Sequence, residues 1–442
     1  MIKPDPITEN YLVTPRIVRS GKYGKIRIIP RCSNARFDRA EKIVSVDLYD
    51  VSGMTSRGTH SIFEETEPSL KWQLEADGSM TIEAFFAGEQ EYTLVVKTEK
   101  FGHKIGSKRN KVLKFAFYAV ADDLYGKYPF RGDLHLHSEQ SDGELAPEAV
   151  AVRGRELGMD FLAVTDHRLY TPSLEACKVF AGLPGGLLVC PGEEVQLADT
   201  FVHIVNFGGE FSVNELAAKD LQKYKNESQA IVDSMPELTP GNEPFPIGAA
   251  QWAFDKIREG NGLSIFCHCF WQVDQYVINE ATTRDILKKC RFDAMEVISG
   301  HGVVNFWSNN QQSAYYAEFA DKNKIASVGC SDTHSAYLDN EFGCVYTICW
   351  AEELSKKSII ENIQAKYSVA AEEMTNNIPR FYGSFRLVRY AGFLRKHYFP
   401  QHDKLCAAEG ILLKEVLAGN KELIPAVKLA AEAVENYRKS LF

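Results

Sequence analysis

The feature that most constrains the fold is a regular alternation of strand-like and helix-like segments that begins near residue 128. Seven short apolar segments have the composition of buried strands: 133–137, 160–167, 186–195, 201–207, 262–270, 293–299 and 325–332. Segments with helical apolar spacing, such as 146–158 and 307–324, lie between them. This alternation predicts an α/β fold with a mostly parallel sheet or barrel of seven strands.

The segments on either side differ from it in residue composition and in the spacing of their apolar residues. The first 127 residues contain short runs rich in β-branched and aromatic residues, separated by turn-like stretches, and they predict an antiparallel β-sandwich domain. Residues 375–442 have the spacing of amphipathic helices and predict a helical extension packed on the barrel. Within the central domain, 128–374, an insertion at about 209–260 breaks the alternation, and it is either a lid over the site or a helical excursion without a role.

Composition narrows the function classes. A net charge of −9 over 442 residues disfavours a general nucleic-acid binder, which needs a concentrated basic surface. Neither a secretory signal nor an apolar run long enough to cross a membrane is visible, so no membrane partner is expected. The ten cysteines are scattered without a disulfide spacing, which fits a reducing cytoplasm. Whether the chain forms a homo-oligomer is left open.

Polar residues of metal-ligand type recur where the predicted strands end. In "DLHLH" the strand period places Asp133, His135 and His137 on one face. Comparable groups end or interrupt the following strands: Asp166 and His167, Glu193 and Glu194, His203, His268, and Asp332 and His334. A buried carboxylate is costly without a cation, and active sites of α/β barrels lie at the carboxyl ends of strands. The pattern therefore predicts a site for two or three divalent metal ions held by imidazole and carboxylate.

The ordered motifs "DLHLHS…SDG", "TDH", "GEE", a lone strand histidine, "CHCF" and "GCSDTH" resemble those of the PHP (polymerase and histidinol phosphatase) superfamily. The resemblance covers about residues 128–375. It implies a metal-dependent phosphoesterase on a distorted seven-stranded (β/α)7 barrel, in agreement with the seven strands counted above. A β domain in front of the first motif also resembles, more weakly, the arrangement of carbaryl-hydrolase-like metallohydrolases.

The resemblance also implies a ligand set. Glu194, rather than Glu193, matches the bridging glutamate, and Asp142 matches the acidic or histidine ligand that follows the opening motif. An aspartate at that position favours manganese or iron over zinc. "CHCFW" departs from the family pattern "AHP" because it lacks the proline. The metal ligands implied for this chain are His135, His137, Asp142, His167, Glu194, His203, His268, Asp332 and His334.

The expected reaction is hydrolysis of a small-molecule phosphate ester by a metal-bridging hydroxide near Glu194. Asp142 is a further candidate catalytic residue. His301 is a candidate proton donor or substrate contact, with a surface or supporting role as the alternative. Arg168 and Trp271 directly follow ligand motifs and are candidates for contacting the phosphate and the leaving group.

Other polar residues receive plainer interpretations. Asp133 and Asp166 either orient neighbouring ligands or have no role at the site. Glu193 is expected to be a partner of a barrel cation or a solvated carboxylate. Cys267 and Cys269 are expected to face away from His268 and to pack on helices, because neighbours in a strand point to opposite faces.

Other functions stay open. The same metals could serve hydrolysis of a carboxylic or carbamate ester, since the ligands do not distinguish phosphorus from carbonyl carbon as the target. A nuclease is disfavoured by the net charge. A non-enzymatic alternative treats the barrel as a structural metal module and the β-sandwich as the part that binds a protein or glycan.

Overall fold

The computed structural model describes residues 10–40, 42–50, 54–57, 60–63, 70–99, 111–273, 276–300, 306–323, 325–335, 342–373 and 378–442. Internal contacts divide the chain into two compact units. One contains Pro129–Ala391 and Gln401–Val434, and the other contains Ile2–Tyr128, Gly392–Pro400 and Glu435–Phe442. The residues of the expected helical extension are thus shared between both units, and the limits at 127/128 and 374/375 stay predictions.

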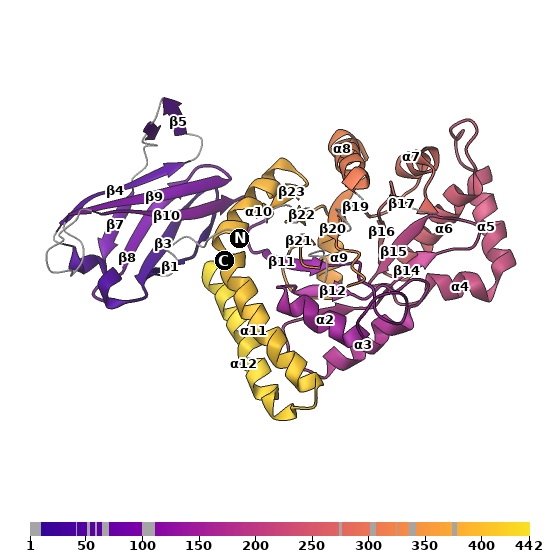
Figure 1. Ribbon diagram of the computed structural model, residues 1–442. Helices are drawn as coiled ribbons and strands as arrows, with labels where there is room; N and C mark the ends of the chain where they lie inside the picture. The colour runs from indigo at the N-terminus through magenta and orange to yellow at the C-terminus, as the bar shows by residue number, and fades with distance from the viewer. Residues whose placement is uncertain are drawn as a thin grey trace. The chain divides into compact units, whose positions relative to one another are not determined.

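The N-terminal unit contains two four-stranded sheets around one apolar core (Figure 1). The first has the order β1 (Tyr11–Thr14), β3 (Lys22–Pro30), β8 (Met80–Phe86), β7 (Lys71–Leu74). The second has the order β2 (Ile17–Arg19), β10 (Lys111–Val120), β9 (Gln90–Glu99), β4 (Lys42–Asp50). Buried side chains of both sheets, such as Ile26 and Phe117, belong to a single cluster. This agrees with the expected β-sandwich, except that β2 and β10 run parallel.

The larger unit has the expected mixed α/β architecture, but its strands are divided between two main sheets. The six-stranded sheet has the order β13 (Leu188–Cys190), β12 (Phe161–Ala163), β11 (Tyr128–Asp133), β21 (Val345–Ala351), β22 (Ser368–Glu372), β23 (Arg380–Tyr382). The five-stranded sheet has the order β14 (Gly192–Gln196), β15 (His203–Phe207), β16 (Leu263–Phe266), β19 (Ala294–Ser299), β20 (Ala326–Cys330). Short ribbons β5–β6 (Met54–Arg57, His60–Phe63) and β17–β18 (Gln272–Val273, Tyr276–Val277) complete the described strands.

The pairing differs from a uniformly parallel sheet. Strands β11, β12 and β13 pair in parallel, as do β16, β19 and β20. In contrast, β14 pairs antiparallel with β15, and β15 with β16. The single strand expected at 186–195 is two strands, because Pro191 separates β13 from β14 and proline cannot donate to a strand ladder. A closed seven-stranded barrel is not defined by these sheets and stays a prediction.

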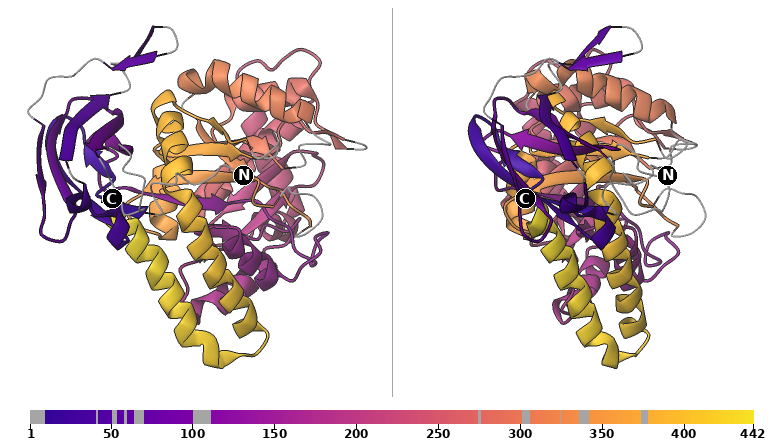
Figure 2. Two further views of the ribbon diagram at one scale, coloured as in Figure 1. Left: turned by 60° about the vertical axis from the view of Figure 1, so that its left-hand side comes forward. Right: turned by 90° about the vertical axis from the view of Figure 1, so that its left-hand side faces the viewer.

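Helices connect the strands (Figures 1 and 2), and several of them begin after a side-chain N-cap. Ser212 caps α4 (Val213–Lys219) by accepting a hydrogen bond from the Glu215 N–H. Ser355 caps α9 (Lys356–Gln364) in the same way. The other helices of at least seven residues in the described chain are α2 (Pro147–Glu156), α3 (Thr171–Ala181), α5 (Leu221–Asp233), α6 (Phe245–Glu259), α7 (Glu280–Lys289), α8 (Phe306–Asn323), α10 (Phe385–His397), α11 (Phe399–Leu417) and α12 (Ile424–Leu441).

The insertion at 209–260 is helical and contains α4, α5 and α6. Side chains of α6, including Trp252 and Phe254, belong to the same apolar cluster as Phe266 of β16, so this segment is packed on the sheet rather than solvated. Figures 1 and 2 show α11 and α12 running side by side as an antiparallel pair. None of the helices in the described chain is long and apolar enough to cross a membrane.

Candidate metal centre

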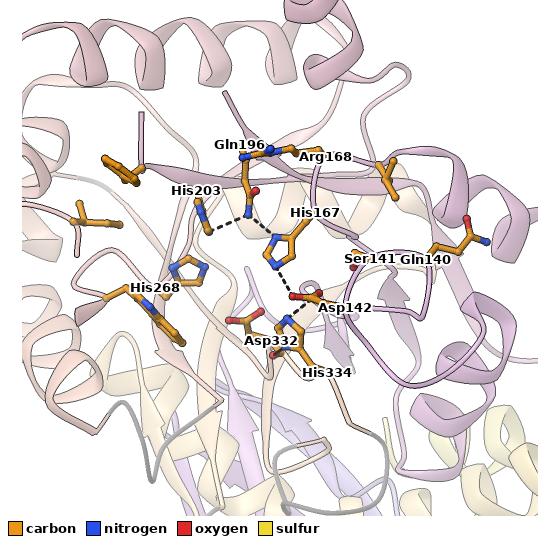
Figure 3. A pocket seen from close by; sticks show the side chains of 14 residues that line it. Gln140, Ser141, Asp142, His167, Arg168, Gln196, His203, His268, Asp332 and His334 are labelled. Atoms are coloured by element: carbon orange, nitrogen blue, oxygen red, sulfur yellow. Dashed lines mark hydrogen bonds and ion pairs between the residues drawn. The ribbon is translucent and has the colours of Figure 1, made fainter. Parts of the chain in front are cut away.

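A cavity of about 840 Å³ opens at the strand ends and combines polar and apolar walls (Figure 3). Six of the residues that line it are predicted metal ligands, and they come from segments far apart in the sequence. The cavity therefore lies where the sequence predicts the site. Its lining consists of Gln140, Ser141, Asp142, His167, Arg168, Leu169, Gln196, Phe201, His203, His268, Trp271, Ile278, Asp332 and His334.

Glu194, on β14, is the centre of the cluster and is completely buried. Five imidazole nitrogens surround its two carboxylate oxygens. They are His167 Nδ1 at 2.5 Å, His203 Nδ1 at 2.8 Å, His268 Nε2 at 3.1 Å, His135 Nε2 at 3.5 Å and His137 Nε2 at 3.6 Å. A carboxylate in this position can bridge two cations that are held by histidines on either side.

Two further carboxylates complete the cluster. Asp332 Oδ1 lies 3.0 Å from His137 Nε2 and 3.2 Å from His135 Nε2, below the surface of the site. Asp142 is about half exposed, and Figure 3 shows it between His167 and His334. Its oxygens lie 3.3 Å from His167 Nε2 and 3.2 Å from His334 Nε2. All nine predicted ligands are thus brought together in one cluster.

Backbone links between the strand ends hold these side chains in place. The His137 N–H donates to the Thr333 carbonyl at 3.0 Å, and the Asp332 N–H donates to the His135 carbonyl at 2.9 Å. On the other side, the Glu194 N–H donates to the Asp166 carbonyl at 3.2 Å. The chain segments after β11, β12 and β20 therefore continue to pair beyond their regular strands.

Three residues of the site have a left-handed backbone conformation. Arg168 has φ of 60°, Asp332 has φ of 50° and His268 has φ of 21°. Such angles are unfavourable for residues other than glycine and occur mainly where the surrounding structure enforces them. All three lie after the end of a strand: Arg168 follows β12, His268 follows β16 and Asp332 follows β20.

The histidines and carboxylates of the cluster strongly shift one another's pKa values. Burial, the largest influence on Glu194, would raise its pKa, but the imidazoles of His203, His167 and His135 outweigh burial and hold it well below the usual range. Burial lowers the pKa of His137 to about 4. At His167 burial also lowers the pKa, but Glu194 and Asp142 reverse this effect and raise it to about 10. Buried carboxylates are stable here only next to positive charge, which either protons or metal ions can supply.

The donors fit metal ions. Three buried atoms have charged neighbours within ion-pair distance but make no hydrogen bond in the described chain: His135 Nε2, His137 Nδ1 and Glu194 Oε2. Buried polar atoms normally have hydrogen-bond partners, so atoms without them suit cations instead. Four overlapping groups have ligand atoms within 4.8 Å of one another: His137, Asp142, His167 and His334; His135, His137 and Glu194; His167, Glu194 and His203; and His135, Cys267 and His268. Imidazole and carboxylate donors suit manganese, iron and zinc.

Buried carboxylates outside the cluster orient its members. Asp133 accepts hydrogen bonds from the backbone N–H groups of His135 and Ser331 at 3.3 and 3.1 Å. Asp166 accepts from the Ser138 backbone at 2.7 Å and from its hydroxyl at 2.6 Å, and it also accepts from Ser141. Both aspartates thus fix the loop that carries the first ligands, which is the orienting role considered from the sequence.

Glu296 was not singled out from the sequence. This fully buried residue of β19 lies 3.2 Å from His135 Nδ1 through Oε2, and it accepts from the His268 N–H at 3.1 Å through Oε1. The signal was present, because a single carboxylate within the apolar strand "AMEVIS" is as unusual as a histidine there. Gln196 was also missed. Its Nε2 lies 2.5 Å from His167 Nδ1 and 3.5 Å from His203 Nδ1 (Figure 3).

The expectation for Glu193 was wrong. Its side chain is buried and faces away from the cluster, since neighbours in β14 alternate. It accepts hydrogen bonds from the Ser212 hydroxyl at 2.7 Å, from the Val213 N–H, and from Asn214 at 2.9 Å. Glu193 therefore anchors the start of α4, where a negative charge is favourable.

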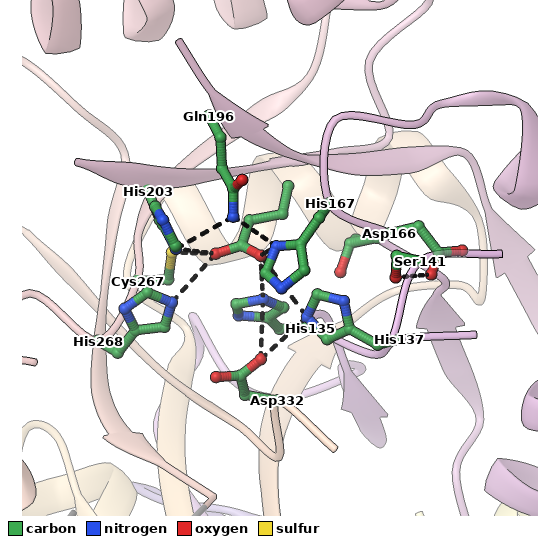
Figure 4. A network of polar contacts seen from close by, with 12 residues as sticks. His135, His137, Ser141, Asp166, His167, Gln196, His203, Cys267, His268 and Asp332 are labelled. Carbon is green, nitrogen blue, oxygen red and sulfur yellow. Dashed lines mark hydrogen bonds and ion pairs between the residues drawn. The ribbon is translucent and has the colours of Figure 1, made fainter. Parts of the chain in front are cut away.

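The expectation for Cys267 was also wrong, whereas Cys269 lies in the apolar core as expected. The sulfur of Cys267 faces the cluster, 3.8 Å from Glu194 Oε1 (Figure 4). The strand alternation ends because β16 stops at Phe266 and His268 has a positive φ. Cys267 and His268 consequently both point toward Glu194.

Arg168 and Trp271 both line the cavity. Their contacts with a phosphate and a leaving group stay predictions. Around these two residues lies an apolar wall that the sequence did not indicate, formed by Leu169, Phe201 and Ile278. Phe201 is 65% exposed and Leu169 is 40% exposed, so both offer contact area to a ligand. His301 lies outside the described residues.

No protein-family model matches this chain, and no curated protein matches it. Several solved structures match it. A two-domain protein from Bacteroides vulgatus, described as containing a predicted PHP-like metal-dependent phosphoesterase, is 19% identical, with a TM-score of 0.38, over 57% of this chain and 67% of that one. A protein from Bifidobacterium adolescentis described as a metal-dependent phosphoesterase is 17% identical, with a TM-score of 0.33, over 46% and 87%. An amidohydrolase from Chromobacterium violaceum is 18% identical, with a TM-score of 0.30, over the same shares. The chain is thus similar to PHP-like metal-dependent phosphoesterases and to an amidohydrolase, and its function is proposed below from its own residues.

Proposed function

We propose that this protein is a metal-dependent hydrolase of small-molecule phosphate esters. The observation that carries the proposal is the buried carboxylate of Glu194, with five imidazole nitrogens within 3.6 Å of its oxygens. Such a concentration of donors has no structural need, because an apolar core would stabilise the strand ends more simply. It is expected where cations must be bound at a cavity.

The proposed ligands are the nine residues predicted from the sequence, holding two or three ions of manganese, iron or zinc. Divalent cations at this position lower the pKa of bound water and neutralise charge on a transferred phosphoryl group. Glu194 and Asp332 supply the buried negative charge, and the histidines supply neutral donors. Asp142 is about half exposed, so it is the carboxylate best placed to exchange protons with solvent at Oδ1 and Oδ2.

The cavity walls favour a substrate that has a phosphate at one end and an apolar leaving group at the other. Arg168 is the one arginine or lysine among the described lining residues, and its guanidinium can form paired hydrogen bonds with a phosphate. The exposed faces of Phe201 and Leu169 can hold an apolar leaving group and exclude water from it. We therefore propose a phosphate monoester or diester of an apolar alcohol or phenol.

The apolar wall also favours a second candidate, a carboxylic or carbamate ester. Such a substrate is neutral and would need contact with Phe201 and Leu169 more than with Arg168. The two candidates differ in what Arg168→Met should do. Its removal should slow a phosphate ester strongly and a carbamate little.

The test compares protein stripped of metal with protein reloaded with manganese. Wild type, Glu194→Gln and Glu193→Gln would receive an aryl phosphate, an aryl phosphodiester and an aryl carbamate. We expect manganese-dependent phosphate release by wild type and by Glu193→Gln, and none by Glu194→Gln. Turnover of the carbamate alone would favour the second candidate. A wild type that binds manganese but cleaves nothing would instead support a non-enzymatic binding module.

We also propose that the strand ends form the distorted seven-stranded barrel expected from the sequence. The two sheets are linked at the site by the bridges between Leu136 and Thr333 and between His167 and Glu194. With these links the order β11, β12, β14, β15, β16, β19, β20 returns to β11. An experimental structure with continuous pairing around this ring would support the proposal.

A further inference from the structure

Cys267 is the one thiol among the described residues whose sulfur belongs to a group of candidate metal ligands in the cluster. Its side chain is completely buried, and its sulfur lies 3.8 Å from Glu194 Oε1. The ligand atoms of Cys267, His135 and His268 all lie within 4.8 Å of one another. The sulfur is thus at the inner side of the cluster, away from the half-exposed Asp142.

Glu296 positions both histidines of this group. Glu296 Oε2 lies 3.2 Å from His135 Nδ1, so the Nε2 atom of that ring is left for the cluster. The same carboxylate accepts the His268 backbone N–H at 3.1 Å and fixes the turn that brings Cys267 inward. His135 Nε2 is buried without a hydrogen bond in the described chain, and His268 Nε2 lies 3.1 Å from Glu194 Oε1. The unsatisfied Nε2 atom of His135 is a second indication, independent of the thiol, that this position binds an ion.

The surroundings of Cys267 differ from those of the neighbouring buried thiol. Cys269 is also fully buried, but it belongs to an apolar cluster with Phe266 and Ile286, where a cysteine acts as a small apolar side chain. Cys267 instead lies next to a carboxylate and two imidazoles. A thiol gains little from such neighbours by packing, whereas a cation held by these neighbours would stabilise a thiolate at this position.

We propose that Cys267 is a sulfur ligand of the ion held by His135, His268 and Glu194. The thiol loses its proton to solvent when the ion binds, as metal-bound cysteines do. This inference rests on the proposed metal binding but not on the proposed reaction. It also implies that the inner position prefers zinc or iron, since thiolates select softer metals than carboxylates do, whereas the position near Asp142 suits manganese.

Spectroscopy of the metal-loaded protein tests the inference without an activity assay. Stripped wild type would be loaded with cobalt(II), together with Cys267→Ala and the matched control Cys269→Ala, and bound cobalt would be measured by elemental analysis. We expect a near-ultraviolet sulfur-to-cobalt charge-transfer band in wild type and Cys269→Ala, and its loss in Cys267→Ala at equal bound cobalt. We also expect the preference for zinc over manganese to fall roughly tenfold in Cys267→Ala.

Zinc K-edge X-ray absorption on wild type alone keeps the inference testable if Cys267→Ala does not fold. A sulfur shell at about 2.3 Å would support it. Bound zinc or cobalt without any sulfur signature would overturn it while leaving the proposed metal centre intact. Failure of wild type to bind either metal would overturn both.

Discussion

Replacing Glu296 by glutamine should weaken metal binding although the residue is not a proposed ligand. Its carboxylate lies 3.2 Å from His135 Nδ1 and accepts the His268 N–H at 3.1 Å. In Glu296→Gln the amide oxygen can still accept from the His268 backbone, but an NH₂ group then faces His135 Nδ1. The imidazole must become the acceptor at Nδ1, so its proton moves to Nε2, the atom that faces Glu194 and Asp332.

The magnitude follows from losing one correctly protonated ligand. Mutating a residue that orients a metal-bound histidine typically reduces affinity by about 10- to 100-fold, equivalent to about 1.4 to 2.8 kcal/mol. The fold should suffer less, because the substitution preserves the volume of the side chain and the hydrogen bond to His268. The loss should therefore be larger in metal affinity than in the unfolding free energy of the metal-free protein.

The assay is calorimetric titration of manganese and zinc into stripped protein, with urea unfolding of the same preparations. Glu193→Gln is the matched control, since Glu193 is equally buried and adjacent to the site but bonds to α4. It should lower the unfolding free energy and leave metal affinity within about twofold. Wild-type affinity in Glu296→Gln, or equal losses in both variants, would refute the reasoning.

Three further predictions concern the fold and the cavity. Arg155→Met should lower the unfolding free energy by about 3 to 5 kcal/mol in urea titrations, because it leaves Asp160 and Glu409 buried without their guanidinium partner. As the control, Glu280→Gln in an exposed ion pair should lower it by less than about 0.5 kcal/mol. Burial, with Arg16 and Lys396, lowers the pKa of His397 to about 2, so the unfolded chain takes up a proton below pH 6.5 that the folded chain does not. Between pH 7 and pH 5 the unfolding free energy of wild type should consequently fall by about 2 kcal/mol more than that of His397→Phe. Unfolding free energies that change equally with pH in the two proteins would contradict this. Phe201→Ala should raise KM for an aryl phosphate more than for a phosphate ester of a short polar alcohol, and equal changes would argue against the apolar wall.

The sequence alone identified site residues where a polar side chain interrupts an otherwise apolar strand. Histidines and carboxylates in or directly after apolar strands led to eight of the nine predicted ligands that the structure brings together, and the family resemblance supplied the ninth, Asp142. The same criterion would have identified Glu296 if it had been applied to every strand. In contrast, exposed apolar residues such as Phe201 are common on surfaces, so the cavity wall carried no signal in the sequence.

Backbone conformation accounts for the errors. Strand alternation predicted that Cys267 would face away from His268, and it would have done so in a continuous strand. The positive φ of His268 is enforced by surrounding contacts, which no local pattern reveals. Likewise, one apolar run at 186–195 became two strands in different sheets because of Pro191, whose effect could have been read from the sequence.

The opposite orientations of Glu193 and Glu194 have a consequence for chimeras. The Glu194 side chain faces the candidate metal centre, and the Glu193 side chain is bonded to Ser212 and Asn214 at the start of the 209–260 insertion. Asn214 also bonds to the Glu194 carbonyl at 3.2 Å and accepts the Gln196 N–H at 3.0 Å. An exchange of this insertion between proteins would therefore need to carry residues 212–214 along with it. Otherwise β14 would lose contacts that position the Glu194 carboxylate, and a graft that contains none of the proposed ligands would disable the site.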